Sequence, residues 1–300
     1  MDMTQNKCCR HGANLRRRRR RRRKILRSII FSCSIIAVAV FVAVGSSMIR
    51  SGDGRTNRYD VEAGNNTYDN AVIENSKISE KNKIQNNQSM LDDIMNSTQY
   101  PKQLKDLALK NEEALEFVYD YPAEHVKEHT IDLTEEASMD SVPLFVQWDK
   151  RWGYEKYSGN FFAASGCCPT TLSMVVVCLT HNREASPIAV AKYSKEAGYS
   201  VDGSGSSWTL ISEGCMHYGV KAKAVALDES RMKAELDEGH PIVVNVGPGD
   251  FTDTGHFMVI TGYDDEGFSI NDPNSIEKSG KRWLFKNISS QIRAVWSMYV

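Results

Sequence analysis

The sequence has no CxxC pair and no cluster of cysteine and histidine with metal-ligand spacing. Proteins usually hold zinc with such clusters, so we expect no metal. The GxxxxGK[ST] order of a phosphate-binding loop is also missing, because no lysine follows the glycine-rich residues 203–207. We therefore expect no cofactor, and we interpret residues 203–207 as a connecting or cleft-lining loop.

Large apolar residues are scarce from residue 51 to about residue 90, a stretch rich in Asn, Ser, Lys and Glu. Such a segment buries too little surface to offset the entropy lost on ordering. The composition therefore predicts a disordered polar linker over residues 50–99.

Acidic residues are nearly absent from residues 1–50, where thirteen basic residues face Asp2 alone, a net charge of +12. The whole chain carries −1, so the remaining 250 residues carry −13. The basic run at 16–23 contains no aromatic residues, and an apolar run over 29–44 follows it directly. This order favours a membrane over nucleic acid as the partner of the basic run.

Extended to residue 49, the apolar run reaches the roughly 20 residues that a membrane-spanning helix needs. Positive charge before the span holds the amino terminus in the cytoplasm. We predict a cytoplasmic tail over 1–27 and a signal-anchor over 28–49, with the C-terminal domain outside a single-pass cell membrane protein. The alternative is a signal peptide that is cleaved near residues 43–45, followed by secretion.

A helical pattern of leucines begins after Pro101 and ends near Tyr121. It places a leading helix and connector over 100–140, either packed on the following domain or standing alone. The domain over 141–300 begins with an extended arm at 142–149. Its predicted helices cover 167–180, 187–197, 207–218 and 228–238, with a short closing helix over 287–293. Its predicted strands cover 220–226, 241–246, 256–263, 268–271 and 282–285. Helices followed by antiparallel strands indicate an α+β fold.

The domain is organised around a turn, Ser165-Gly166-Cys167-Cys168-Pro169, that leads into an apolar helix. Gly166 permits unusual backbone angles, and Pro169 suits a first helical turn. A cysteine at a helix start lies beside free N–H groups, which favour the reactive thiolate. Cys167 is therefore the candidate nucleophile. Cys178 and Cys215 are expected to be buried free thiols.

A cysteine nucleophile needs a base and a third group that orients the base. His256 begins an apolar strand, and Gly255 before it leaves room beside the ring. Asp272 follows the next strand of a predicted hairpin, close enough to reach the imidazole because paired strands lie about 4.8 Å apart. Asn271 is the alternative orienting residue, although it should point to the opposite face.

The oxyanion of an acyl-transfer intermediate needs fixed hydrogen-bond donors. The backbone N–H of Cys167 is one candidate, and the side-chain amide of Gln147 is the other. Gln147 precedes Cys167 by twenty residues, so this assignment requires the intervening loop to fold back. We expect Trp208, Ser207 and Gly255 to contact the substrate.

Four blocks in this order resemble papain-like cysteine peptidases related to the double-glycine leader peptidases of bacteriocin exporters: VPLFVQWDKRW, SGCCPTTLSM, GHFMVITGYD and NDPN. The resemblance covers about residues 142–298. It implies a papain-like fold in which the helix bearing the nucleophile packs on an antiparallel sheet. It also implies Cys167 as nucleophile, His256 as base, Asp272 as orienting residue and Gln147 as oxyanion donor.

One residue departs from the family pattern, because Cys168 stands where these peptidases usually have glycine. This change would distort the turn or make Cys168 the reactive thiol. We expect a membrane-tethered, extracytoplasmic cysteine peptidase that acts on a peptide or protein. The alternatives are a peptidoglycan amidase or endopeptidase, although no wall-binding repeat is visible, and a catalytically degenerate surface binding module.

Overall fold

The computed structural model describes residues 66–300, with side chains from residue 80 onward. Within this part, residues 66–85 and residues 86–300 belong to separate compact units. The predicted tail and signal-anchor over 1–27 and 28–49 lie outside the described residues. No helix among the described residues combines the length and the apolar character needed to cross a membrane.

Part of the predicted linker is helical, which corrects the expectation of disorder up to residue 99. Helix α2 covers Asn66–Asn96, and neither glycine nor proline interrupts this stretch before Pro101. These are the two residues that most strongly disfavour a helix interior. At the end of α2, Ile94 is fully buried in a cluster with Leu104 and Phe117. Packing of the last turns therefore adds stability that the polar composition of the segment does not predict.

The leading segment consists of several short helices instead of the single predicted one. These are α3 (Lys102–Lys110), the 3-10 turn η1 (Glu112–Ala114), α4 (Leu115–Tyr119), α5 (Tyr121–Glu124) and α6 (Thr134–Ala137). The break comes at Asn111, whose backbone is extended and whose side chain accepts a hydrogen bond from the N–H of Glu113. Pro122 lies in the first turn of α5, where its missing N–H costs nothing. Leu104, Phe117 and their neighbours pack against Phe161, so the leading segment is part of the domain.

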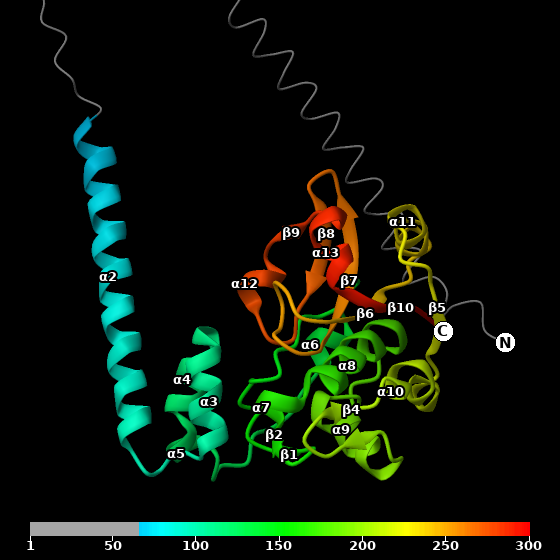
Figure 1. Cartoon of the computed structure of the whole chain (residues 1–300), viewed down its shortest axis with the longest axis horizontal. Coiled ribbons are helices and arrows are strands. Elements are labelled where there is room, and N and C mark those ends of the chain that lie inside the picture. Colours follow the sequence, from blue (N-terminus) through cyan, green and yellow to red (C-terminus); the bar gives the residue numbers. More distant parts are fainter. Residues whose placement is uncertain (1–65) are drawn as a thin grey trace, which may run out of the picture. The chain divides into compact units, whose positions relative to one another are not determined.

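The predicted arm over 142–149 forms no strand: residues 142–146 have no regular secondary structure, and residues 147–148 lie in a turn. A hairpin and two helices follow: β1 (Lys156–Tyr157), β2 (Asn160–Phe161), α7 (Phe162–Ser165) and α8 (Cys167–Thr180). The next elements are α9 (Pro187–Glu196), β3 (Ser200–Val201), β4 (Gly205–Ser206), α10 (Thr209–Ser212) and the 3-10 helix η2 (Gly214–Tyr218). The bounds of α8 agree with the sequence prediction, and Ser186 caps α9 as expected. In Figure 1, α8, α9 and α10 lie together below the sheet.

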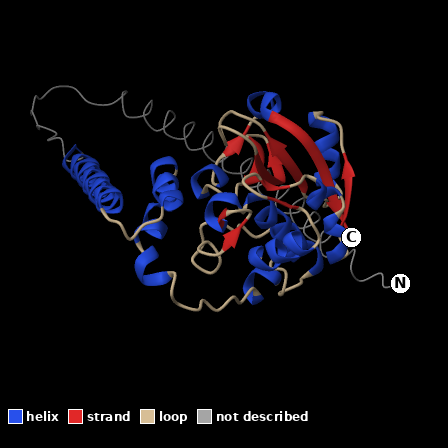
Figure 2. Ribbon diagram, turned by 60° about the horizontal axis from the view of Figure 1, so that its bottom comes forward, coloured by secondary structure: helices blue, strands red, loops and turns tan. Residues whose placement is uncertain are grey.

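The last third of the chain forms a six-stranded antiparallel sheet with the order β5-β10-β6-β7-β8-β9. Its strands are β5 (Lys221–Ala224), β6 (Ile242–Val246), β7 (His256–Asp264), β8 (Gly267–Asn271), β9 (Arg282–Trp283) and β10 (Ile292–Tyr299). Between them lie α11 (Glu229–Asp237), α12 (Ile276–Ser279), α13 (Phe285–Ile288) and η3 (Ser289–Gln291). Figure 2 shows the strands as one curved layer.

The end of the chain corrects a prediction. The closing helix expected over 287–293 is shorter and earlier, and β10 follows it as an interior strand between β5 and β6. β10 is rich in apolar and aromatic residues, which suit a strand. Its place in the sheet comes from pairing with β6, about fifty residues earlier, and no local pattern records such a pairing.

Both faces of the sheet are covered. Val243 and Val259 face a core that α8 fills with Leu172 and Val176. The alternate residues, such as Val244, face a second core with Met232 of α11. Side chains alternate between the faces of a strand, so α8 and α11 lie on opposite sides of the sheet. The confirmed α+β arrangement places the start of α8 against β7.

Candidate active site

Cys167 is the first residue of α8, directly after Gly166. The backbone of Gly166 has φ −87°, which any residue can adopt, so the expected unusual backbone angle is not the reason for glycine. A side chain there would instead place its Cβ 2.6 Å from the ring of the buried Phe162. Glycine therefore allows the chain to approach Phe162 closely before it enters the helix.

Cys167 is a partly exposed residue, and its thiol interacts with the His256 side chain through a hydrogen bond. Burial alone would raise the pKa of the Cys167 thiol. The hydrogen bond and charge of His256, with the backbone N–H groups of Phe257 and Cys168, outweigh burial and lower that pKa. A thiolate at Cys167 is thus favoured by partners from β7 as well as from its own helix.

Cys168, the next residue, is buried beside Cys167. Its side chain is 1% exposed and belongs to the core between α8 and the sheet. Burial, followed by the nearby charge of Cys167, raises the pKa of the Cys168 thiol well above its usual value. The residue is the second in a regular helix, so its position does not require the backbone freedom of glycine. The departure from the family pattern is therefore accommodated by the core.

His256 and Asp272 meet as the hairpin predicts. His256 begins β7 and Asp272 directly follows β8, and His256 Nε2 lies 2.7 Å from Asp272 Oδ1. Because Nε2 faces the carboxylate, the other ring nitrogen, Nδ1, is left for the Cys167 thiol. The Asp272 side chain is fully buried, and Oδ1 also accepts a hydrogen bond from the N–H of Asn274 at 2.8 Å. These contacts fix the orientation of the imidazole between the sulfur and the carboxylate.

The carboxylate strongly favours the charged form of the imidazole. Burial by itself would lower the pKa of His256. The charge and hydrogen bond of Asp272, helped by Cys167, overcome burial and raise the pKa of His256 to about 10. Since the pKa of Cys167 is lowered at the same time, the two shifts together favour a thiolate–imidazolium pair.

Gln147 reaches the site because the loop before Cys167 folds back. Its backbone N–H donates to the carbonyl of Pro273 at 2.7 Å, beside Asp272. Its side-chain Nε2 donates to the carbonyl of Ala163, also at 2.7 Å. An amide nitrogen carries two hydrogens, so a second N–H is left, and Gln147 lines the same cavity as Cys167.

Two cavities meet at Cys167. The first, of about 490 Å³, lies on the side of His256 and Gln147. The second, of about 680 Å³, is lined by the residue 203–206 loop and Trp208. Asn160, Cys167 and Gly255 line both cavities. Cys167 therefore lies where the two cavities adjoin, and we refer to the two cavities together as the cleft.

A family model described as the Peptidase_C39 like family matches residues 139–300. The chain belongs to this family. Membership indicates a cysteine peptidase. A crystal structure from Bacillus anthracis, described as a candidate C39-like peptidase, is 17% identical in sequence to this chain and has a TM-score of 0.33. The match covers 57% of this chain and 98% of the chain in that crystal structure. No curated protein matches the chain significantly.

The residues expected to contact substrate fall in different places within this C39-like domain. Gly255 and Trp208 line the cleft, and Trp208 is 46% exposed and packs edge-on against Trp296. Ser207 lines neither of the two cavities, and its hydroxyl instead bonds to that of Thr209 at 2.6 Å. Asn271 also turns away, because its amide donates to the carbonyls of Val142 and Pro143. It holds the start of the 142–149 segment and does not orient His256.

Sequence reasoning missed one wall of the cleft. Gln103, Asp106 and Lys110, all on α3, line the first cavity together with Cys167 and His256. They precede the region matched by the family model, and the spacing of apolar residues in a helix does not indicate which cleft the helix borders. Tertiary contacts place α3 there, because its apolar side chains pack with Phe161 and Ala163.

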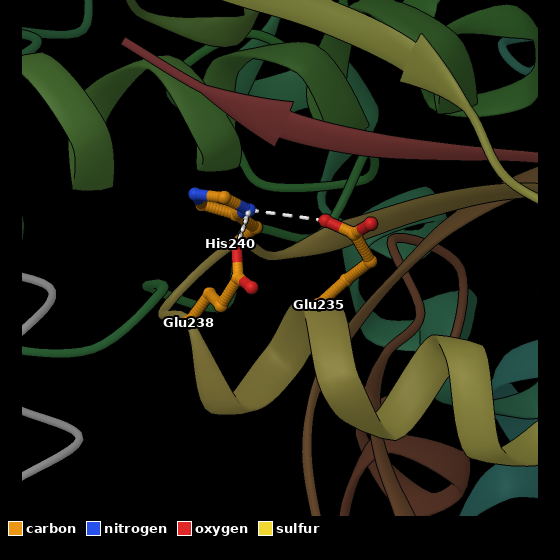
Figure 3. A group of neighbouring side chains, drawn as sticks. All are labelled: Glu235, Glu238 and His240. Carbon is orange, nitrogen blue, oxygen red and sulfur yellow. Dashed lines mark hydrogen bonds and ion pairs between the residues drawn. The ribbon is translucent and has the colours of Figure 1, made fainter.

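A second group of titratable residues lies near the end of α11 in the C39-like domain. Glu235, Glu238 and His240 have potential ligand atoms within 4.8 Å of one another (Figure 3). Glu235 already pairs with His240 at 3.1 Å, with Ser297 at 2.8 Å and with Lys223 at 3.6 Å. These hydrogen bonds and ion pairs account for the arrangement without an ion.

Proposed function

We propose that the chain is a cysteine peptidase that cleaves peptide bonds with Cys167 as nucleophile, His256 as acid and base, and Asp272 as orienting residue. The observation that carries the proposal is the unbroken contact series from the Cys167 thiol through the His256 ring to the buried Asp272 carboxylate. Cys167 borders both cavities of the cleft, which leaves room for a substrate beside it. The arrangement has the nucleophile, base and orienting group that covalent catalysis requires.

Acylation begins when the Cys167 thiolate attacks the carbonyl carbon of the scissile amide. A sulfur–carbon bond forms, and the π electrons move to the carbonyl oxygen. When the carbonyl re-forms, the carbon–nitrogen bond breaks and His256 gives its proton to the leaving amine. The products are a thioester on Cys167, a neutral imidazole and the released amine.

Deacylation uses the same groups in reverse. His256, now neutral, takes a proton from water while the water oxygen attacks the thioester carbon. The carbon–sulfur bond then breaks, which releases a carboxylic acid and restores the thiolate–imidazolium pair. Asp272 keeps the ring orientation constant through both half-reactions, because its hydrogen bond at Nε2 leaves Nδ1 directed at the reacting atoms.

Two donors would stabilise the oxyanion. The N–H of Cys167, as the first residue of α8, has no acceptor within its own helix. Gln147, whose amide nitrogen has a second N–H, lines the same cavity as Cys167. Gln147 is held from both its backbone and its side chain, so little reorganisation is needed when charge develops on the oxygen.

An electrophilic peptide probe tests the assignment of the nucleophile. The full chain, treated with a peptidyl chloromethyl ketone, should gain one probe mass at Cys167, seen by intact-mass analysis and fragmentation. Cys167→Ala should abolish labelling, while Cys168→Ala, the matched control one residue away, should keep most of it. Labelling at Cys168 would move the nucleophile by one residue. No labelling of a folded chain would instead support a degenerate binding module.

We also propose that residues 28–49 anchor the peptidase domain outside the cell membrane. The support is the order of charge and apolar character in the sequence: a basic run, then an apolar run of membrane-spanning length. Protease treatment of intact cells should remove a domain of the size of residues 50–300, and the chain should pellet with membranes. Release of a shortened, soluble chain into the medium would point to a cleaved signal peptide.

A further inference from the structure

The family model begins at residue 139, yet an earlier carboxylate holds the loop that follows Asp272. The Glu113 side chain accepts hydrogen bonds from three groups at the start of α12. They are the hydroxyl of Ser275, the N–H of Ile276 at 2.7 Å and the N–H of Glu277 at 3.1 Å. Free N–H groups at a helix start are stabilised by a carboxylate, so Glu113 fixes where α12 begins.

Asn111 makes a second connection from the same short turn. Its side-chain nitrogen donates to the carbonyl oxygen of Asn274 at 2.9 Å and to the side-chain oxygen of Asn274 at 3.1 Å. Its side-chain oxygen accepts from the N–H of Glu113 at 3.0 Å. Asn111 thus holds Asn274 and orders the turn that presents Glu113.

The held loop leads directly to the orienting carboxylate. The N–H of Asn274 donates to Asp272 Oδ1, the same oxygen that bonds to His256. The N–H of Ser275 donates to the backbone carbonyl of Asp272 at 3.2 Å. Residues contacted by Asn111 and Glu113 therefore help to hold the Asp272 side chain and backbone, together with Ser279, which bonds to the backbone of Asp272. The other Asp272 oxygen, Oδ2, has no hydrogen-bond partner among the described residues, so the position of the carboxylate depends strongly on this loop.

We propose that Glu113 and Asn111 are positioning residues, which act through the Asp272 loop to keep the His256 ring aligned with Cys167. The inference rests on the proposed cysteine peptidase function and extends it: the leading segment, although outside the family-matched region, completes the active site. Without it the loop after β8 would lose five hydrogen bonds, counting two from Asn111 and three to Glu113.

The reactivity of the Cys167 thiol towards iodoacetamide reports this alignment. Iodoacetamide reacts with thiolate, so the rate at Cys167 against pH measures how well the imidazolium stabilises the sulfur. The full chain is used, and fragmentation mass spectrometry locates the modification. In Glu113→Ala the midpoint of the profile should rise by about one pH unit. At pH values below the midpoint, the thiolate fraction would then be about tenfold smaller than in the unmodified chain. Loss of folding alone would not shift the midpoint of the molecules that remain folded.

Two further variants separate positioning from general packing. Asn111→Ala removes the donor to Asn274 without adding charge to the first cavity, which Asn111 also lines, so the midpoint should shift in the same direction. Glu116→Gln is the matched control, because Glu116 is an exposed carboxylate of the adjacent α4. Its profile should superimpose on that of the unmodified chain. If Glu113→Ala does not fold, Glu113→Gln and Asn111→Ala decide the question.

The outcomes distinguish the two levels of the proposal. If the unmodified chain shows a low midpoint and the Glu113 and Asn111 variants retain it, the positioning role is wrong and the peptidase proposal stands. If Cys167 of the unmodified chain titrates as an ordinary thiol, the peptidase proposal fails. Glu113 and Asn111 would then have no aligned Cys167–His256 pair to support. A raised midpoint in both variants, with an unchanged Glu116→Gln profile, supports the inference.

Discussion

Cys167 and Asp272 lie on either side of the His256 ring, and different kinds of structure hold them. Cys167 begins α8, whose buried apolar side chains pack on the sheet. Asp272 lies in a loop that depends on hydrogen bonds with Ser279, Asn274 and the leading segment. The nucleophile is thus positioned by a packed core, whereas the orienting carboxylate is positioned by a polar network.

This difference predicts different responses to substitution. A packed helix tolerates the loss of one contact because many others remain. A buried polar network responds strongly, since each unpaired group inside the protein is costly. We therefore expect conservative polar substitutions around Asp272 to affect activity more than similar changes near α8, and the predictions below test this contrast.

Asp272→Asn should have the largest effect on activity. The amide keeps the shape of the side chain but loses the charge that stabilises the imidazolium, and the expected loss in kcat is about 10⁴-fold, as for other oriented histidines. Steady-state hydrolysis of a cleaved peptide measures it. Asp265→Asn, at an exposed position of the β7–β8 turn, is the control. A loss below about tenfold would mean that the carboxylate does not orient His256.

Gln147→Ala should have the next largest effect. Removal of one oxyanion donor typically costs about 10²–10³-fold in kcat. Because the donor acts on charge that develops in the transition state, KM should change little. Gln147→Asn keeps an amide on a shorter side chain and should restore part of the rate. A variant with raised KM and normal kcat would show that Gln147 contacts the substrate in its ground state instead.

The dependence of the rate of the unmodified chain on pH should be bell-shaped. One pH unit should change this rate less than either substitution does. The reactive pair needs a deprotonated Cys167 and a protonated His256. The rate should therefore rise with pH through the lowered pKa of Cys167 and fall again as pH passes the pKa of His256, about 10. In Asp272→Asn the alkaline limb should move to lower pH, because the charge that raises the pKa of His256 is gone. An alkaline limb near the ordinary histidine pKa in the unmodified chain would contradict the ion pair.

The sequence predicts the packed region better than the polar network, for physical reasons. The bounds of α8 follow from an apolar run after a turn, and the β7–β8 hairpin follows from alternation around a turn; both signals are local. β10, by contrast, takes its place by pairing with distant strands. The contact of Glu113 with residues 275–277 joins segments more than 160 residues apart. A helix capped by a distant carboxylate and a strand paired with distant strands both depend on contacts between remote segments. Neither leaves a pattern among neighbouring residues in the sequence.

Gly166→Ala tests the packed side of the comparison and should give the smallest effect on activity per molecule that remains folded. The new Cβ would lie 2.6 Å from the ring of Phe162, which is fully buried and cannot move without disturbing the core. Such overpacking typically costs about 1–3 kcal/mol, partly offset by about 0.4–1 kcal/mol from a less flexible unfolded chain. Urea unfolding should therefore show a modest loss of stability.

Gly280→Ala supplies the matched control, because a Cβ there would meet the carbonyl of Glu277 at an ordinary 3.4 Å and the backbone φ of −74° suits alanine. This variant should be as stable as the unmodified chain or slightly more so, since only the unfolded-state term remains. Equal stability of the two variants would mean that Phe162 relaxes freely. The close approach of Gly166 to Phe162 would then not determine how the chain enters α8. The claim that core packing positions the nucleophile, in contrast to the hydrogen-bonded carboxylate, would fail.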